Sequence, residues 1–410
     1  MHPSQAVPTA EPSAAGAALP ADLTRLVGRE REVAEVRRLL AEERLVTLTG
    51  AGGIGKTRLA LAVAADASGF ADDVRWVDVA AVGEPQLVPQ HVAAACGVWD
   101  GAAASAVDLL VGALAPESLL LVLDNCEHLV EASALLVDRL LRSCPRLRVL
   151  ATSREALGIA GEQAWLVPPL ALPPEDETAR AGDVLAAAAV ELFVERARGA
   201  RPGFLLADED APTVAQICRR LDGLPLALEL AAARIKVLAP RELARRLDDA
   251  FALLTGGART APPRHRTLRA TLDWSYRLLD EAERSVLRRL SVFLGAFDLE
   301  GAEAVAAGEG VEREAVLDLV AALVDRSLLT VESVAGRARY RLLETVRRYA
   351  TERLAEAGER ERAARRHVRH HLALAEAAEP EVFGGGGEGA MRRLDEHATD
   401  LRAAFEHAAA

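Results

Sequence analysis

RLVTLTGAGGIGKTRLALAVAADA, residues 44–67, is the stretch that decides the fold. It opens with a short apolar run, passes through a glycine-rich turn and continues into an Ala- and Leu-rich helical pattern. Within it, GAGGIGKT at residues 50–57 matches the pattern G-x-x-x-x-G-K-[ST], and a strand before it with a helix after it is the context that confirms this motif. The stretch therefore predicts an α/β domain with a phosphate-binding loop.

The chemistry of such a loop follows from its residue types. Glycines let backbone N–H groups converge on an anion at the positive end of the helix, and a lysine adds a compact charge for β- and γ-phosphates. Lys56 is one of only two lysines, the other being Lys236, so a point charge is kept where a guanidinium would not fit. The alternative is a plain glycine-rich turn. The residues predicted to bind ATP or ADP here are Gly50, Ala51, Gly52, Gly53, Ile54, Gly55, Lys56, Thr57 and Arg58.

Further apolar runs predict the rest of a sheet. Nearly continuous hydrophobic segments occur at 74–80, 119–125 and 146–154, and a fifth strand is plausible at 164–170. Strands without alternation are typical of parallel sheets that are covered on both faces. Helical stretches separate most of them, so we predict a doubly wound P-loop NTPase fold.

Two polar clusters follow these strands. Asp124 ends the run LLLVLD, so its carboxylate is expected beside the loop, where with Thr57 it would hold Mg²⁺; the alternative is a turn aspartate. Asn125, Glu127 and His128 are candidates to orient an attacking water, and Glu127 is the best base by chemistry. Arg154 ends the next strand, where a cation could sense the γ-phosphate, although a surface arginine fits the spacing nearly as well.

The remaining chain changes character twice. Residues 186–248 read as helices, and helices at 267–279, 281–293 and 314–325 precede two strand-like pieces, 327–333 and 337–343, as in a winged helix. We predict a disordered leader (1–22), a P-loop nucleotide-binding domain (23–174), a small helical domain (175–260), a winged-helix domain (261–357), and a helical linker that would begin a helical-repeat region (358–410). The last residues resemble one helix of something larger, so the chain could be a fragment.

Composition narrows the setting. The net charge of −12 disfavours nucleic-acid binding without a local basic patch, and four scattered cysteines without a CxxC pair indicate reduced thiols. There is no secretory leader and no apolar run of about 18 residues. These features predict a soluble cytoplasmic protein with no membrane partner.

Seven blocks, spread over residues 26–357, resemble the STAND-class P-loop ATPases with the NB-ARC arrangement, and particularly bacterial ATP-binding transcriptional regulators of the large LuxR and SARP types. The blocks are LVGRE (26–30), the P-loop, LLLVLDNCEHL (119–129), ATSRE (151–155), GLPLALEL (223–230), TLRATLDWSYRLL (267–279) and YRLLETVRRYA (340–350). The resemblance implies a signal-transduction switch that holds ADP when closed, exchanges it for ATP on sensing an unknown inducer, and forms a homo-oligomer in the ATP state.

The resemblance also assigns roles. It implies that Val27, Gly28 and Arg29 lie against the adenine with Pro225, and that Arg154 is the γ-phosphate sensor. Two departures stand out. Asn125 replaces a second acid, so we expect at most a slow ATPase, and Leu343 stands where many relatives have a histidine that touches ADP.

Three weaker signals remain open. Residues 261–370 hold 20 Arg against 18 Asp and Glu, a balance of 20 − 18 = +2, so the winged helix is expected to pack on the ATPase core and DNA contact to come through a missing effector domain. His367 and His371 could share a helix face as metal ligands, but no nearby acidic motif completes a site, and the run 360–371 is expected to be a solvated helix face. The competing functions are a metabolic phosphotransferase with a small acceptor and a direct DNA-binding protein.

Overall fold

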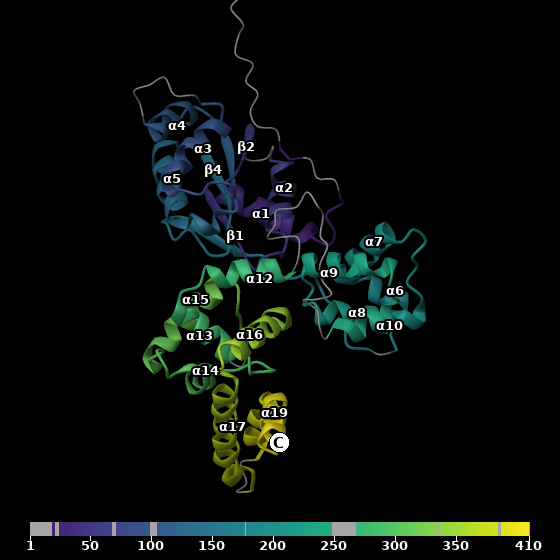
Figure 1. The fold of residues 1–410 in the computed structure, drawn as a ribbon. Coiled ribbons are helices and arrows are strands. Elements are labelled where there is room, and N and C mark those ends of the chain that lie inside the picture. Colours follow the sequence, from purple (N-terminus) through teal and green to yellow (C-terminus); the bar gives the residue numbers. More distant parts are fainter. Residues whose placement is uncertain are drawn as a thin grey trace, which may run out of the picture. The chain divides into compact units, whose positions relative to one another are not determined.

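The structure is a computed structural model, and it describes residues 19–20, 24–67, 71–98, 105–176, 178–247, 268–334, 336–383 and 387–409 (Figure 1). Apart from Leu19 and Pro20, the predicted leader at 1–22 lies outside the described residues, as do residues 384–386 of the glycine run. The chain divides into two compact units. Unit 1 holds the described residues up to Leu26, Arg31–Leu48 and Thr57–Trp165, and unit 2 holds Val27–Glu30, Thr49–Lys56 and the chain from Leu166 onward.

Unit 1 is built on a five-stranded sheet in the order β2-β3-β4-β1-β5. The strands are β1 (Leu45–Thr49), β2 (Asp73–Asp78), β3 (Leu119–Asp124), β4 (Leu147–Thr152) and β5 (Glu162–Leu166). The pairs β1–β4, β2–β3 and β3–β4 are parallel. Every residue of β1 and β3 is buried, whereas the edge strand β5 is mostly exposed. The predicted parallel sheet is confirmed, with β5 ending four residues earlier than expected.

Helices cover both faces of this sheet. Leu121 and Leu123 of β3 share one core with Val92 of α3 (Val88–Ala95), Leu110 of α4 (Ala106–Leu114) and Leu140 of α5 (Val130–Ser143). Figure 1 places α1 (Glu30–Glu42) and α2 (Lys56–Ala64) on the other side of the sheet. Burying each such leucine stabilises the fold by about 1.5–3 kcal/mol, so the apolar runs that identify the strands also supply the core.

Unit 2 begins with a helical segment. It contains α6 (Ala181–Leu185), α7 (Ala188–Ala200), α8 (Ala211–Arg220), α9 (Pro225–Ala232) and α10 (Pro240–Arg246). Helix α7 packs against α8 and α9, and α8 packs against α10. Pro225 occupies the first turn of α9, where its missing N–H costs no helical hydrogen bond. The helices predicted within 186–248 are confirmed as far as Leu247, since residues 248–250 are not described.

A winged helix follows in unit 2. Its elements are α12 (Leu268–Arg277), α13 (Glu281–Leu290), α14 (Leu299–Ala306), α15 (Val316–Asp325), the antiparallel hairpin β6 (Thr330–Val334) and β7 (Arg337–Arg341), and α16 (Glu344–Glu356). The hairpin occurs where two strand-like pieces were predicted. Helix α14 was not predicted; it is short, and Asp298 caps it by accepting a hydrogen bond from the N–H of Gly301.

Three further helices complete unit 2: α17 (Arg360–Phe383), α18 (Gly387–Glu396) and α19 (Ala398–Ala409). Helix α17 packs against α14, α18 and α19. The expectation of a fully solvated face at 360–371 is wrong, because Ala363, His367 and His371 of α17 are buried. In the described part of the chain, no helix is both long enough and apolar enough to cross a membrane.

Candidate nucleotide site

The glycines of the predicted loop adopt the backbone conformations that this residue allows. Gly50, Gly53 and Gly55 have φ angles of 146°, 82° and 100°. At Gly53 a Cβ would lie 2.8 Å from the Cβ of Leu226, so a side chain would collide with α9. The N–H of Leu226 donates to the carbonyl oxygen of Gly53 over 3.2 Å. The loop is therefore held against the start of α9, the segment that contains Pro225.

Lys56 is folded back over this loop. Its ammonium donates to the carbonyl oxygens of Gly50 at 2.7 Å and Ala51 at 3.3 Å, and the side chain is buried. These bonds keep the charge at the mouth of the loop, at the first residue of α2. A planar guanidinium would not fit between two carbonyls of one tight turn, which agrees with the retention of lysine in an arginine-rich chain.

The segment Val27–Arg29 lies beside the loop within unit 2. The buried Arg29 guanidinium donates to the carbonyl oxygen of Ile54 over 3.2 Å. Gly28 has a φ of 61°, and a Cβ on it would lie 2.2 Å from the Cβ of Ala188 in α7. Pro225 is also near the loop, since a Cβ on Gly55 would be 3.9 Å from its Cγ. Unit 2 thus brings the residues expected around the adenine next to the residues expected around the phosphates.

Within unit 1, Thr57 and Asp124 meet directly. The Thr57 hydroxyl donates to Oδ1 of Asp124 over 2.9 Å, and the Thr152 hydroxyl donates to the same oxygen over 2.5 Å. Asp124 is almost completely buried, and this burial raises the pKa of its carboxyl to about 6, against the lowering effect of the two threonine hydroxyls. A nearby cation would favour the carboxylate. The pair has the donor atoms that Mg²⁺ prefers, a hydroxyl and a carboxylate.

Asn125 is built into the same corner of unit 1. Its φ of 67° is left-handed, a conformation that asparagine tolerates better than most residues. Its side-chain amide donates to Oδ1 of Asp78 over 2.9 Å and to Oδ2 of Asp124 over 2.8 Å, and its N–H donates to the Thr152 hydroxyl. An acid at position 125 could donate neither side-chain bond when ionised. Sequence reasoning missed Asp78 and Thr152, although each ends a strand neighbouring β3.

Glu127 and Arg154 face one another. The Arg154 Nε lies 3.5 Å from a Glu127 carboxylate oxygen, and both side chains are about 5% exposed. His128 is engaged elsewhere, with ring nitrogens 3.2 Å from the carbonyl oxygen of Asn125 and 3.0 Å from that of Val82. The expected base and the expected γ-phosphate sensor are therefore partners in a buried ion pair in this structure.

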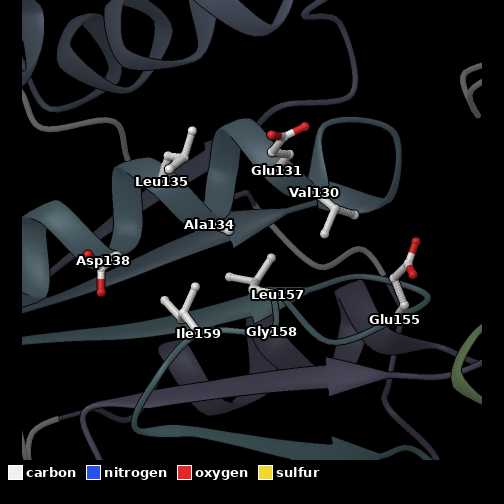
Figure 2. Close-up of a pocket in the computed structure, with 9 residues that line it drawn as sticks. All are labelled: Val130, Glu131, Ala134, Leu135, Asp138, Glu155, Leu157, Gly158 and Ile159. Atoms are coloured by element: carbon white, nitrogen blue, oxygen red, sulfur yellow. The ribbon is translucent and has the colours of Figure 1, made fainter.

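A separate pocket of about 450 Å³ lies on unit 1 between α5 and the loop after β4. Figure 2 shows its apolar floor, with Leu135 and Leu157, and the acidic side chains at its rim. None of the residues predicted to bind nucleotide lines it, so we assign it no part in that function.

The sheet, the P-loop and the hairpin define an α/β protein of the P-loop NTPase class that carries a winged helix. A family model described as a winged helix-turn-helix domain matches residues 279–355, which confirms the predicted winged helix. Among solved structures, the STAND protein PH0952 from Pyrococcus horikoshii, which has a tetratricopeptide repeat sensor, is 17% identical with a TM-score of 0.35, covering 93% of this chain and 53% of that one. Cdc6p from Pyrobaculum aerophilum is 13% identical with a TM-score of 0.38, covering 82% and 96%.

Two relatives from Mycobacterium tuberculosis are much more similar. "Uncharacterized protein Rv0894" is 47% identical over 350 residues, which are 85% of this chain and 86% of that protein. "Putative HTH-type transcriptional regulator Rv0890c" is 46% identical over 370 residues, which are 90% of this chain and 40% of that protein. The chain belongs to the family of these mycobacterial proteins, and the predicted resemblance to bacterial P-loop regulators is confirmed. It spans about two fifths of the length of Rv0890c.

Proposed function

We propose that the chain is a switch that binds ATP or ADP with Mg²⁺, hydrolyses ATP slowly and regulates transcription, and that it does so in the cytoplasm. The observation that carries this proposal is the loop at 50–57, with its three left-handed glycines and the buried ammonium of Lys56. Such a loop offers converging N–H groups and one positive charge to terminal phosphates. Thr57 and Asp124 would hold the metal ion.

The proposed switch needs contacts that pass the state of the nucleotide onward. The Gly53 carbonyl is hydrogen-bonded to the start of α9, and Pro225 in the same turn is next to Gly55. Just before α9, Asp222 accepts hydrogen bonds from the first N–H groups of α16 in the winged helix. We propose that a γ-phosphate at the loop changes the position of α9 and, through Asp222, that of α16, because only contacts that differ between ATP and ADP can bias a conformation.

Slow hydrolysis follows from the same corner of unit 1. Asn125 supplies no second carboxylate, and the Glu127 carboxylate lies against Arg154 rather than being free to accept a proton. We propose that Arg154 senses the γ-phosphate by exchanging Glu127 for it. The predicted segments 23–174, 175–260, 261–357 and 358–410 would then act as nucleotide-binding, closing, winged-helix and connecting parts.

Direct DNA reading by the winged helix is the second candidate, favoured by the matched domain model. Helix α15 stands just before the hairpin, the position of a recognition helix, yet VLDLVAALVD contains two aspartates and no basic residue. A helix of this charge is repelled by phosphates. We therefore propose that DNA contact is made by a part of the whole protein beyond this chain, with the ATP state forming the homo-oligomer.

The switch proposal is tested by preparing the full chain with ADP and with a non-hydrolysable ATP analogue, each with Mg²⁺. Hydrogen exchange at α9 and α16 and the mass in solution by light scattering are then compared. We expect faster exchange and a larger mass with the ATP analogue. Identical exchange and mass in both states would contradict the switch, even if both nucleotides bind.

A further inference from the structure

A second cluster of ionisable side chains is buried in unit 2, among residues that the proposed switch does not use. His367 and His371 come from α17, and Asp400 comes from α19. Their exposures are 4%, 0% and 1%. One ligating atom from each lies within 4.8 Å of those of the other two. The acidic partner that was not apparent near the two histidines in the sequence is supplied by a helix 33 residues further along.

The ring of His371 is oriented as a metal ligand would be. Its Nδ1 lies 2.9 Å from the carbonyl oxygen of His367, and because a carbonyl only accepts, this nitrogen carries the hydrogen. In the neutral ring Nε2 then has a free lone pair. This buried atom has no hydrogen-bond partner within the described part of the chain. Histidines that bind metals commonly donate their other N–H to a backbone carbonyl in this way.

The carboxylate of Asp400 is fixed independently of the histidines. It accepts from the N–H of Leu294 at 2.7 Å and from that of Gly295 at 3.0 Å. A Cβ on Gly295 would lie 2.9 Å from Oδ2 of Asp400, so this approach depends on the glycine. Oδ1 also lies 3.2 Å from Nε2 of His367, which leaves both atoms aimed at the same space.

The cluster can be reached from solvent. A cavity of about 660 Å³ is lined by His367 together with residues of α16 and α19, including Thr351 and Ala403. Buried ligands that adjoin a cavity have both an entry path for an ion and room for a water molecule.

We propose that His367, His371 and Asp400 form a binding site for a divalent transition-metal ion of the zinc class, which joins α17 to α19. Two imidazoles and one carboxylate, with water in the fourth position, are a ligand set that zinc accepts. Tetrahedral ligands about 2.0–2.2 Å from zinc lie about 3.3 Å apart, so small side-chain movements would close the site. The ion would replace the hydrogen now shared by His367 and Asp400, and the neutral His367 ring would carry its hydrogen on Nδ1.

The neighbouring charges have been considered. Arg339 lies close to the cluster, but its guanidinium is bonded to His397 and to the carbonyl oxygens of Ala296 and Glu396. It also lies 3.7 Å from the carboxylate of Asp298. Its charge is thus matched by its own partners, and it does not take the place of a metal ion among the three ligands.

The test uses the full chain without an affinity tag, treated with a chelator and then dialysed. Zn²⁺ is titrated in competition with a chromophoric chelator, without nucleotide, for the native chain and for His371→Gln, His367→Gln and Asp400→Asn. His370→Ala is the matched control, because it removes a partly buried histidine of the same helix that is outside the three-ligand set and keeps all four cysteines. We expect one tight Zn²⁺ equivalent in the native chain, an affinity at least about 100-fold lower in the three variants, and a change under about threefold in the control.

Thermal unfolding provides a second measurement. Zn²⁺ should raise the Tm of the native chain and of His370→Ala but not that of His371→Gln, because a ligand stabilises only a state that binds it. The Tm without metal shows whether each variant folds. Native Zn²⁺ affinity no higher than that of folded His371→Gln, or equal loss in His370→Ala, would overturn the site.

Discussion

Asp222 and Thr345 are separated by 123 residues in the sequence, yet the carboxylate of Asp222 accepts hydrogen bonds from both the N–H and the hydroxyl of Thr345, at 3.0 and 3.1 Å. It also accepts from the N–H of Glu344 over 3.0 Å. These donors are the first of α16, which have no partner inside their own helix. A residue next to the segment GLPLALEL therefore caps the last helix of the winged helix.

Removing this cap should destabilise unit 2. We expect Asp222→Ala to cost about 1–3 kcal/mol, because two backbone donors and one hydroxyl lose a buried acceptor. Asp318→Ala, at an exposed position on α15, is the control and should cost less than about 0.5 kcal/mol. Chemical denaturation of both variants gives the free energies; equal values would show that the cap adds no stability.

Gly53 should be intolerant of any side chain. Gly53→Ala combines a left-handed φ with a collision against Leu226, whereas Gly203→Ala has a similar φ of 86° and nothing within 4 Å. We expect Gly203→Ala to cost about 1 kcal/mol and Gly53→Ala at least about 1 kcal/mol more. The Gly53 variant should also lose nucleotide affinity. If calorimetry gives both variants native affinity for ADP, the loop does not hold the phosphates as proposed.

Glu127 and Arg154 should behave as a coupled pair. Removing either partner leaves a buried charge without its counter-charge, which typically costs about 3–5 kcal/mol. The double substitution Glu127→Gln with Arg154→Met should therefore cost clearly less than the sum of the single ones. Additive costs in a double-mutant cycle of unfolding free energies would mean that the two groups are not coupled in solution.

Acid should weaken the start of α16. Burial acts to raise the pKa of Glu344, but Arg347 and Arg348 outweigh it and hold this pKa below its ordinary value. A carboxyl with a lowered pKa in the folded state contributes stability above its ordinary pKa of 4.5, and this contribution is lost as the pH falls through the lowered value. The native chain should exceed Glu344→Gln in Tm at pH 7, and the difference should vanish near pH 3. A difference that persists at pH 3 would contradict this origin.

The sequence predicts those features whose cause is local. The P-loop lies in one continuous stretch, and the strands at 119–124 and 147–152 are recognisable because each is buried on both faces. The hairpin at 330–341 follows from two short runs with a tight connection. Edge strand β5 is less well predicted, since its exposed side chains carry little hydrophobic signal.

Features that depend on distant contacts could not be predicted. Asp78 and Thr152 reach Asn125 only because β2, β3 and β4 are neighbours in the sheet, and Asp222 reaches α16 only through the packing of unit 2. The same holds for Asp400, which joins the two histidines across a helix–helix contact. Sequence spacing identified the histidine pair, but spacing within one helix contains no information about the partner helix.

The central claim is that Lys56 and the loop around it grip the phosphates of an adenine nucleotide. Isothermal titration of the full chain with ADP and Mg²⁺ tests it most directly, with Lys56→Ala as the variant and Lys236→Ala, the only other lysine, as the control. We expect native and Lys236→Ala chains to bind one ADP with similar affinity and Lys56→Ala to lose at least about 100-fold, a cost of about 2.7 kcal/mol. Native-like binding by folded Lys56→Ala, or no binding by the native chain, would contradict the account.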